Sequence, residues 1–275
     1  MIICLNGSFV DESQAKISVF DHGLLYGDGV FDTILAVNGR IFWLEEHIDR
    51  LLNGCQRIRL RSPWQKPELI TLATETFRRN GGDSGRIRIT ITRGEGDIPI
   101  QSSPTCKPNL IIFSSPLEVY PQAFYERGIR LAVSTHQRVY PGVKNLSFMP
   151  SVLGYLESLE KDAHEALFVD RDGNVLEGST FNVFIVTAGR IKTSPEQILV
   201  GVTRNKVIEL ARRVGLEIEE AKIPLKEALS ADEIFATGTT KRIVPVSQID
   251  ETLINHGIVG EITRKLMAAF SQYYF

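Results

Sequence analysis

The 275-residue sequence lacks the features that mark several classes of protein. It has no cationic surplus, since 31 basic and 33 acidic residues give a formal charge of -2, and a protein without a basic field is a poor partner for nucleic acid or anionic lipid. No stretch approaches the ~18 apolar residues of a membrane span, and the N-terminal MIICLNGSFV has no basic region ahead of its apolar run. We therefore expect a cytoplasmic protein that binds neither nucleic acid nor membrane.

Cysteine and histidine are too sparse and too scattered to form a disulfide framework or a metal centre. Cys4, Cys55 and Cys106 are odd in number, far apart and in no CxxC pair, which indicates small core residues in a reducing compartment. None of the five histidines shows metal-ligand spacing. No GxSxG or P-loop motif is present. The sequence therefore predicts no metal site and none of these motif-based catalytic centres.

The length predicts two domains, because a typical domain has about 100–200 residues. Ser114 to Gln122 contains two prolines and is the best candidate for a linker. We place the boundary near residue 118, which gives a small N-terminal domain over 1–118 and a larger one over 119–275. Strands and helices mix without a steady βαβ rhythm, so the fold class is α+β.

Local patterns predict individual elements along the chain. Asn6-Gly7 indicates a hairpin, and the apolar stripe from Leu44 to Ile58 predicts an amphipathic helix. Arg86 to Thr92 alternates with period two, so both Arg86 and Arg88 are expected on one side of a strand that ends at Arg93-Gly94. The remaining patterns predict strands over 109–113 and 129–134, several strands between 166 and 193, a helix over 151–163, and a helix whose N-cap is Thr203.

Lys144 is the first candidate for chemistry. It stands among apolar and small polar residues in Val143-Lys144-Asn145-Leu146-Ser147-Phe148-Met149, just before a predicted helix. Burial would lower the pKa of a lysine and make it a nucleophile toward aldehydes, as Schiff-base chemistry requires. The alternative is an ordinary solvated lysine.

Glu177 is the second candidate, because it lies between two apolar strands and is expected to be drawn inside. A buried carboxylate needs a cationic partner. A protonated pyridine nitrogen would serve, and so would a nearby arginine. Two segments rich in glycine and threonine, Gly201-Val202-Thr203-Arg204 and Thr237-Gly238-Thr239-Thr240, could offer backbone donors to a phosphate. A plain helix cap and an ordinary turn are the alternatives, and either is the commoner case for such a segment taken alone.

Taken in order, these segments resemble the class IV aminotransferase family, which is fold type IV of the pyridoxal-phosphate enzymes. That family includes branched-chain aminotransferase, D-amino-acid aminotransferase and aminodeoxychorismate lyase. The resemblance spans nearly the whole chain and is carried by six segments: Tyr26-Gly27-Asp28-Gly29-Val30-Phe31, His47-Ile48-Asp49-Arg50-Leu51, Val143-Lys144-Asn145-Leu146, the stretch from Leu176 to Phe184, the stretch from Ile198 to Arg204, and Thr237-Gly238-Thr239-Thr240.

The resemblance implies a two-domain fold, with a small N-terminal α/β domain and a larger C-terminal domain containing a β pseudo-barrel. It implies pyridoxal 5'-phosphate as cofactor, held as a Schiff base by Lys144, which then shuttles the proton at the substrate Cα. Glu177 would keep the pyridine nitrogen protonated. It further implies a homodimer whose substrates are an amino acid and a 2-oxo acid.

The same resemblance assigns the remaining cofactor ligands. Arg50 would bind the phosphate, together with the backbone N–H groups of Val202 and Thr203 and the hydroxyl of Thr239. His47 is expected to be a packing residue of the helix that carries Arg50.

Substrate binding is assigned to residues outside the cofactor motifs. Arg88 stands where branched-chain aminotransferases have an arginine and would bind a carboxylate. Arg86 on the same side would suit a dicarboxylate such as 2-oxoglutarate, whereas an arginine on an exposed strand face is the alternative. Phe31 agrees with the branched-chain pattern. Tyr26 and Thr240 complete the assigned substrate residues.

The donor is left open between L-branched-chain and D-amino acids. Glu95-Gly96-Asp97-Ile98-Pro99 lacks the Arg-x-His carboxylate trap of typical D-specific enzymes, but a D-specific enzyme that uses Arg88 instead is equally consistent with the motifs. The second enzymatic hypothesis is aminodeoxychorismate lyase, which eliminates pyruvate. The third is a catalytically silent binding protein, which would have little reason to keep both Lys144 and Glu177.

Overall fold

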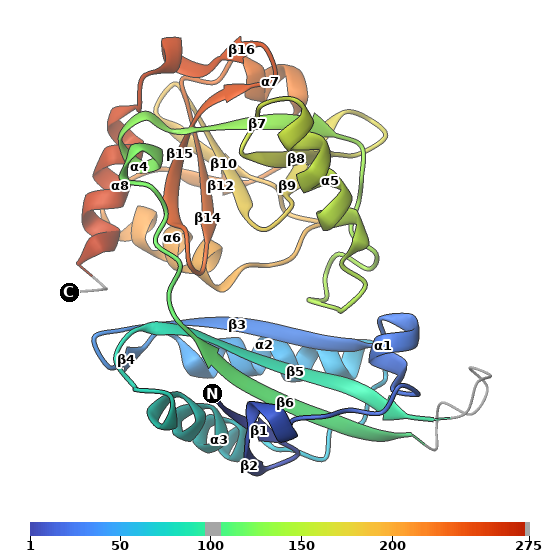
Figure 1. Ribbon diagram of the computed structural model, residues 1–275. Coiled ribbons are helices and arrows are strands. Elements are labelled where there is room, and N and C mark those ends of the chain that lie inside the picture. The colour runs from blue at the N-terminus through green and yellow to red at the C-terminus, as the bar shows by residue number, and fades with distance from the viewer. Residues whose placement is uncertain (97–105, 273–275) are drawn as a thin grey trace. The chain divides into compact units, whose positions relative to one another are not determined.

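The computed structural model describes residues 1–96 and 106–272, which form two compact units (Figure 1). The first unit consists of residues 1–118 together with 143–147, and the second consists of 119–142 together with 148–275. The segment 143–147 thus belongs to the first unit although it follows a stretch of the second. Residues 97–99, which complete the stretch expected to lack the D-specific carboxylate trap, lie outside the described residues.

The first unit is built on a six-stranded antiparallel sheet (Figure 1). Its strand order is β2 (Ser8–Asp11), β1 (Ile2–Leu5), β6 (Lys107–Ser115), β5 (Gly85–Glu95), β3 (Gly29–Val37) and β4 (Arg40–Ile41). Its helical segments are η1 (Glu12–Gln14), α1 (His22–Tyr26), α2 (Leu44–Arg57) and α3 (Lys66–Arg79).

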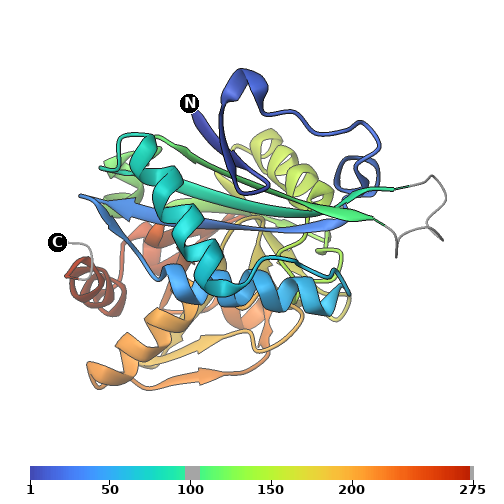
Figure 2. The same ribbon diagram turned by 90° about the horizontal axis from the view of Figure 1, so that it is seen from below.

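The alternation of apolar and charged side chains along β5 fixes which face of this sheet packs into the core. Ile87, Ile89 and Ile91 are fully buried, while Arg86 and Arg88 point to the other face. A register slip of one residue would exchange the isoleucines for the arginines, at a cost of about 1.5–3 kcal/mol for each apolar side chain exposed. Helices α2 and α3 cover the isoleucine face and lie side by side (Figure 2).

The second unit contains a ten-stranded sheet that curls into a half-barrel (Figure 1). Its main order is β12 (Ile218–Glu220), β11 (Arg190–Thr193), β10 (Asn182–Thr187), β14 (Glu233–Gly238), β15 (Arg242–Ile249), β7 (Ile129–Ser134), β8 (Glu165–Val169), β9 (Asn174–Gly178) and β13 (Ile223–Pro224), and β16 (Thr252–Leu253) pairs with β15. Its helical segments are α4 (Gln122–Arg127), α5 (Met149–Glu160), α6 (Val202–Arg213), α7 (Leu225–Leu229), η3 (Ile254–Gly257) and α8 (Glu261–Ser271). The α+β class predicted from the sequence is confirmed.

Most predicted elements are confirmed, with corrections at their ends. The strand predicted to stop at Arg93-Gly94 continues to Glu95 through an irregularity in its pairing with β6. The helix predicted over 151–163 is α5, which begins at Met149 and ends at Glu160. No helix among residues 1–96 and 106–272 is long and apolar enough to cross a membrane.

Thr203 is not the N-cap of α6, as the sequence predicts. The cap is Gly201, and the helix begins at Val202. The reason is a close approach: a Cβ on Gly201 would lie 2.2 Å from the Asn182 Oδ1 atom. Only a glycine allows the chain to enter the helix so near this side chain, so Thr203 falls within the first turn.

Candidate active site

Backbone hydrogen bonds hold Lys144 against strand β3 in the first unit. The Phe31 N–H donates to the Lys144 carbonyl at 2.9 Å, and the Leu146 N–H donates to the Gly29 carbonyl at 3.0 Å. Because one bond involves Lys144 itself and the other a residue two positions later, the lysine backbone has little freedom. Val143, just before it, is buried.

The turn before β3 makes room for this segment. A Cβ on Gly29 would lie 2.6 Å from the Ile91 carbonyl oxygen and 2.7 Å from a methyl of Leu146. Gly27 has a φ of +67°, the left-handed region that favours glycine. Both glycines of the motif that begins at Tyr26 are therefore required by geometry. Tyr26 is the last residue of α1, and its side chain is exposed.

Phe31 brings two cationic side chains together. The Lys144 Nζ atom lies 4.7 Å from the centre of its ring, and the Arg88 guanidinium carbon lies 3.8 Å from it. Burial lowers the pKa of Arg88, and the positive charge of Arg86 lowers it further. Arg86 lies on the same face of β5 but is exposed, and its Nε atom donates to the Ser115 hydroxyl at 2.9 Å. Phe31 thus lies beside Lys144, Arg88 lies against the same ring, and Arg86 lies further toward solvent.

Arg50 is held by a buried carboxylate that sequence reasoning missed. Its Nε and Nη2 atoms donate to the two oxygens of Asp32, each at 2.8 Å. Asp32 is fully buried. Burial alone would raise its pKa, but the charge of Arg50, together with the hydrogen bonds from Arg50 and His47, holds the pKa well below its usual range. Asp32 is therefore a permanent anion at physiological pH.

His47 is buried on α2, as a packing residue would be, and its ring also takes part in this cluster. Its Nδ1 atom lies 2.8 Å from Asp32 Oδ1, and the side chain is fully buried. Burial lowers the pKa of His47 more than the Asp32 charge raises it, so the ring is neutral at pH 7. Because Asp32 can only accept, the proton sits on Nδ1. One signal was available in the sequence: an aspartate within the apolar run Val30 to Ile34 needs a partner.

Glu177 is buried near the end of β9 in the second unit, as predicted. Its Oε1 atom accepts from the Leu199 N–H at 3.1 Å and lies 2.8 Å from the Arg138 Nε atom. Arg138 also donates from Nη2 to the Ser179 carbonyl at 3.0 Å. Arg138 is therefore a cationic partner of the buried Glu177 carboxylate, which such a carboxylate requires. Arg138 lies in a loop, and nothing in the sequence pattern points to it.

The two segments rich in glycine and threonine meet in the second unit. Asn182 pairs with Thr237 across β10 and β14, and it also lies against Gly201 at the start of α6. The hydroxyls of Thr203 and Thr237 are buried and have no hydrogen-bond partner within the described part of the chain. The first turn of a helix also has N–H groups without intrahelical acceptors. This arrangement fits an anion such as a phosphate. Thr239 and Thr240 follow Thr237 in a half-buried turn.

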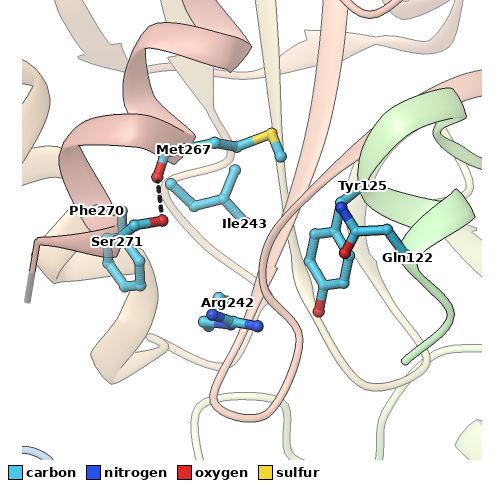
Figure 3. A pocket seen from close by; sticks show the side chains of 7 residues that line it. All are labelled: Gln122, Tyr125, Arg242, Ile243, Met267, Phe270 and Ser271. Atoms are coloured by element: carbon cyan, nitrogen blue, oxygen red, sulfur yellow. Dashed lines mark hydrogen bonds between the residues drawn. The ribbon is translucent and has the colours of Figure 1, made fainter. Parts of the chain in front are cut away.

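A separate cavity of about 210 Å³ lies in the second unit, lined by residues of α4, β15 and α8 (Figure 3). Its lining residues are Gln122, Tyr125, Arg242, Ile243, Met267, Phe270 and Ser271. None of them is a predicted site residue, so this cavity is not the candidate active site. Within residues 1–96 and 106–272, no group of three or more side chains could hold a metal ion.

Comparisons with known proteins identify the family. The family profile described as amino-transferase class IV matches residues 29–249. The chain belongs to the class IV aminotransferases. The resemblance inferred from the six sequence segments is therefore confirmed, and the protein is a transaminase, whose class uses pyridoxal phosphate.

Individual relatives cover almost the full length of this aminotransferase. A protein of Methanocaldococcus jannaschii, provisionally named a branched-chain-amino-acid aminotransferase, is 43% identical over 277 residues, which is 98% of this chain and 95% of that protein. The D-alanine aminotransferase of Bacillus licheniformis is 30% identical over 272 residues, covering 98% and 95% of the two chains. The structure of branched-chain amino acid aminotransferase from Thermobaculum terrenum in its PLP form has a TM-score of 0.90, 27% identity, and coverage of 99% and 93%.

Replacing Asp32 by asparagine should destabilise the aminotransferase by about 3 kcal/mol at pH 7, because it leaves Arg50 without its anion. The folded state depresses the Asp32 pKa, so its contribution is present above the unfolded value of about 3.9 and is lost as the pH falls toward the folded value. Urea unfolding should therefore show wild type and Asp32→Asn converging below pH 4.

The matched control is Asp162→Asn, which removes an exposed partner of Arg130. It should leave the free energy of unfolding almost unchanged both at pH 7 and below pH 4. An Asp32→Asn variant as stable as wild type at pH 7 would contradict the role assigned to Asp32.

Proposed function

We propose that this transaminase moves an amino group between a branched-chain amino acid and a 2-oxo acid such as 2-oxoglutarate, with pyridoxal 5'-phosphate as cofactor held by Lys144. The observation that carries the assignment is the pair of backbone bonds that fix Lys144 beside the Phe31 ring and Arg88. When bound, the cofactor supplies an electron sink for negative charge at the substrate Cα. The Lys144 Nζ atom takes the proton from Cα and returns it.

The residues of the second unit fit the cofactor's phosphate and ring nitrogen. The buried hydroxyls of Thr203 and Thr237, the N–H groups of Val202 and Thr203, and the Thr239 hydroxyl form a set of anion donors. Glu177 is the carboxylate we assign to the ring nitrogen, and Arg138 together with the Leu199 N–H orients it. The chemistry of these residues suits the group.

Arg50 is the arginine we assign to the phosphate. Asp32 binds one edge of the guanidinium through Nε and Nη2. This pairing fixes the plane of the side chain, which favours the directional hydrogen bonds of an arginine with an oxyanion. Asp32 and His47 therefore act on the cofactor through Arg50.

Arg88 is the residue we assign to the substrate carboxylate, and Phe31 and Thr240 to its surroundings. Stacking on Phe31 limits the freedom of the guanidinium, which lowers the entropic cost of binding. Arg86, two residues away on the same face, would serve the second carboxylate of a dicarboxylate. Tyr26, the last residue of α1 before the turn that leads into β3, is also assigned to the substrate.

A D-amino acid donor is the second candidate, because a relative that is 30% identical over nearly the whole chain is named a D-alanine aminotransferase. The relative at 43% identity carries the branched-chain name and supports the first candidate. The lyase alternative is not favoured, since the two relatives and the solved structure described above are all named aminotransferases.

We also propose a cytoplasmic homodimer. Helix α5 exposes one apolar stripe made of Met149, Val152, Leu153, Leu156 and Leu159. Five such side chains on a single helix face are more than a monomer usually leaves in water, which supports association with a second copy. Cys4, Cys55 and Cys106 all lie in the described part of the chain and form no disulfide there, which suits a reducing compartment.

Borohydride reduction tests the assignment of Lys144, because it makes an imine to a lysine permanent. We expect mass spectrometry of the digested protein to find the cofactor mass on the peptide that contains Lys144. Lys144→Ala should lose this adduct and transamination while its circular dichroism stays that of wild type. Lys66→Ala, which alters a surface lysine of the same unit, should keep both. An adduct on another lysine would refute the assignment.

Half-reactions without an acceptor test the donor. The enzyme is mixed in turn with the L and D forms of leucine, valine and alanine, and the visible absorbance of the cofactor is followed. We expect L-leucine and L-valine to bleach it fastest. Faster bleaching by D-alanine would establish the second candidate, and pyruvate released from aminodeoxychorismate without any acceptor would establish the lyase.

Arg88→Gln should raise KM for amino acids and 2-oxo acids about 10- to 100-fold, because a charge-assisted hydrogen bond of about 1.5–3 kcal/mol is lost. Its dissociation constant for the cofactor should stay within about twofold of wild type. Arg86→Gln should raise KM for 2-oxoglutarate and leave KM for 4-methyl-2-oxopentanoate unchanged. If Arg88→Gln changes neither KM, the carboxylate binds elsewhere.

A further inference from the structure

A second buried ion pair lies in the second unit, formed by Glu165 and Lys241. Glu165 begins β8, and Lys241 lies in the turn between β14 and β15, directly after Thr239 and Thr240. The Lys241 ammonium donates to Glu165 Oε1 and to the Thr180 hydroxyl. The two residues are 7% and 8% exposed, so the pair is shielded from solvent.

Glu165 also binds the turn that follows Glu177. The Ser179 hydroxyl donates to Glu165 Oε2, and the Thr180 hydroxyl donates to Oε1 at 2.9 Å. The Ser179 carbonyl in turn accepts from Arg138, the arginine beside Glu177. Lys241, Glu165, Arg138 and Glu177 therefore form a series of alternating charges. Ser179 links its two halves, because its hydroxyl binds Glu165 and its carbonyl binds Arg138.

The pair joins two turns, one next to Glu177 and one that contains Thr239, the residues assigned to the cofactor. One turn follows β9 and Glu177, and the other contains Thr239 and Thr240. Neither turn is linked to the other by strand pairing at these positions, since β9 pairs with β8 and β13, and β14 pairs with β10 and β15. An ion pair in a nonpolar interior has a strongly preferred geometry, because each group must keep its hydrogen bonds.

We propose that Glu165 and Lys241 are positioning residues of the transaminase, which together fix the distance between the Glu177 turn and the Thr239-Thr240 turn and set the electrostatic environment of the bound cofactor. This inference rests on the proposed function, because it assumes that Glu177 and Thr239 bind one cofactor. Neither Glu165 nor Lys241 contacts the reacting atoms in this assignment.

Several other charged or polar groups lie near the pair. The Tyr125 hydroxyl donates to the Lys241 carbonyl at 3.2 Å, and burial raises the pKa of Tyr125. His164 precedes Glu165, and burial lowers its pKa, which favours the neutral ring. The Tyr120 ring lies 5.6 Å from the Lys241 Nζ atom. Arg138 donates to the Ser179 carbonyl, and the Ser179 hydroxyl binds Glu165 of the pair. Substitutions at Glu165 and Lys241 leave these neighbouring groups in place.

The test uses the holoenzyme with Lys241→Met, Glu165→Gln and the double variant. Each single change leaves one buried charge without its partner, and the double change removes both charges. We expect the dissociation constant for pyridoxal 5'-phosphate to rise at least tenfold in each single variant. In the double variant it should return to within about threefold of wild type.

The pH dependence of the cofactor's visible absorbance separates positioning from general loss of structure. Lys241→Met leaves the extra negative charge of Glu165, which favours the protonated form of the bound cofactor, so the midpoint pH should rise by about half a unit or more. Glu165→Gln leaves an extra positive charge, so the midpoint should fall. The double variant should return it toward wild type.

Lys192→Met is the matched control, because it breaks a half-buried lysine–glutamate pair with Glu227 in the same unit. It should change neither the dissociation constant nor the midpoint. Unchanged values in both single variants, or midpoints that move in the same direction, would overturn the proposal. Wild-type protein that takes up no cofactor would instead overturn the proposed function, so the two failures are distinguishable.

Discussion

The need to compensate buried negative charge governs both units of this transaminase. An isolated carboxylate in a protein interior is too costly to persist, so Asp32, Glu165 and Glu177 each have a cation at hydrogen-bonding distance. The partners are Arg50, Lys241 and Arg138, and they come from elements distant in the sequence. Each pair therefore ties two parts of one unit together and fixes the orientation of a side chain assigned to the cofactor, or of the turn that contains it.

Lys144 is held by another means, backbone pairing. The segment 143–147 leaves the stretch of chain that builds the second unit and bonds to β3 of the first. Gly29 permits this approach because a side chain there would meet the Ile91 carbonyl. Two main-chain bonds limit the freedom of the Lys144 backbone, which suits the role of cofactor ligand and base that we propose for this residue.

Much of the candidate site could be predicted from the sequence because its signals are local. Gly27 and Gly29 mark a turn, Lys144 stands among apolar residues, and Glu177 lies between apolar strands. The partners of these residues could not be predicted. Arg138 lies 39 positions from Glu177 in a loop without periodicity, and Lys241 lies 76 positions from Glu165. The sequence placed Thr203 wrongly at the N-cap of α6, because the start of that helix depends on the contact between Gly201 and Asn182.

The sequence by itself determined several of the elements, the α+β class and the family, since these follow from hydrophobic periodicity, turn residues and motifs that are read within a few neighbouring positions. Only the tertiary structure decided which charges are paired, that His47 is a neutral partner of Asp32, and that segment 143–147 joins the first unit. The physical reason is that burial and Coulomb attraction depend on distance in space, which the order of residues along the chain does not specify.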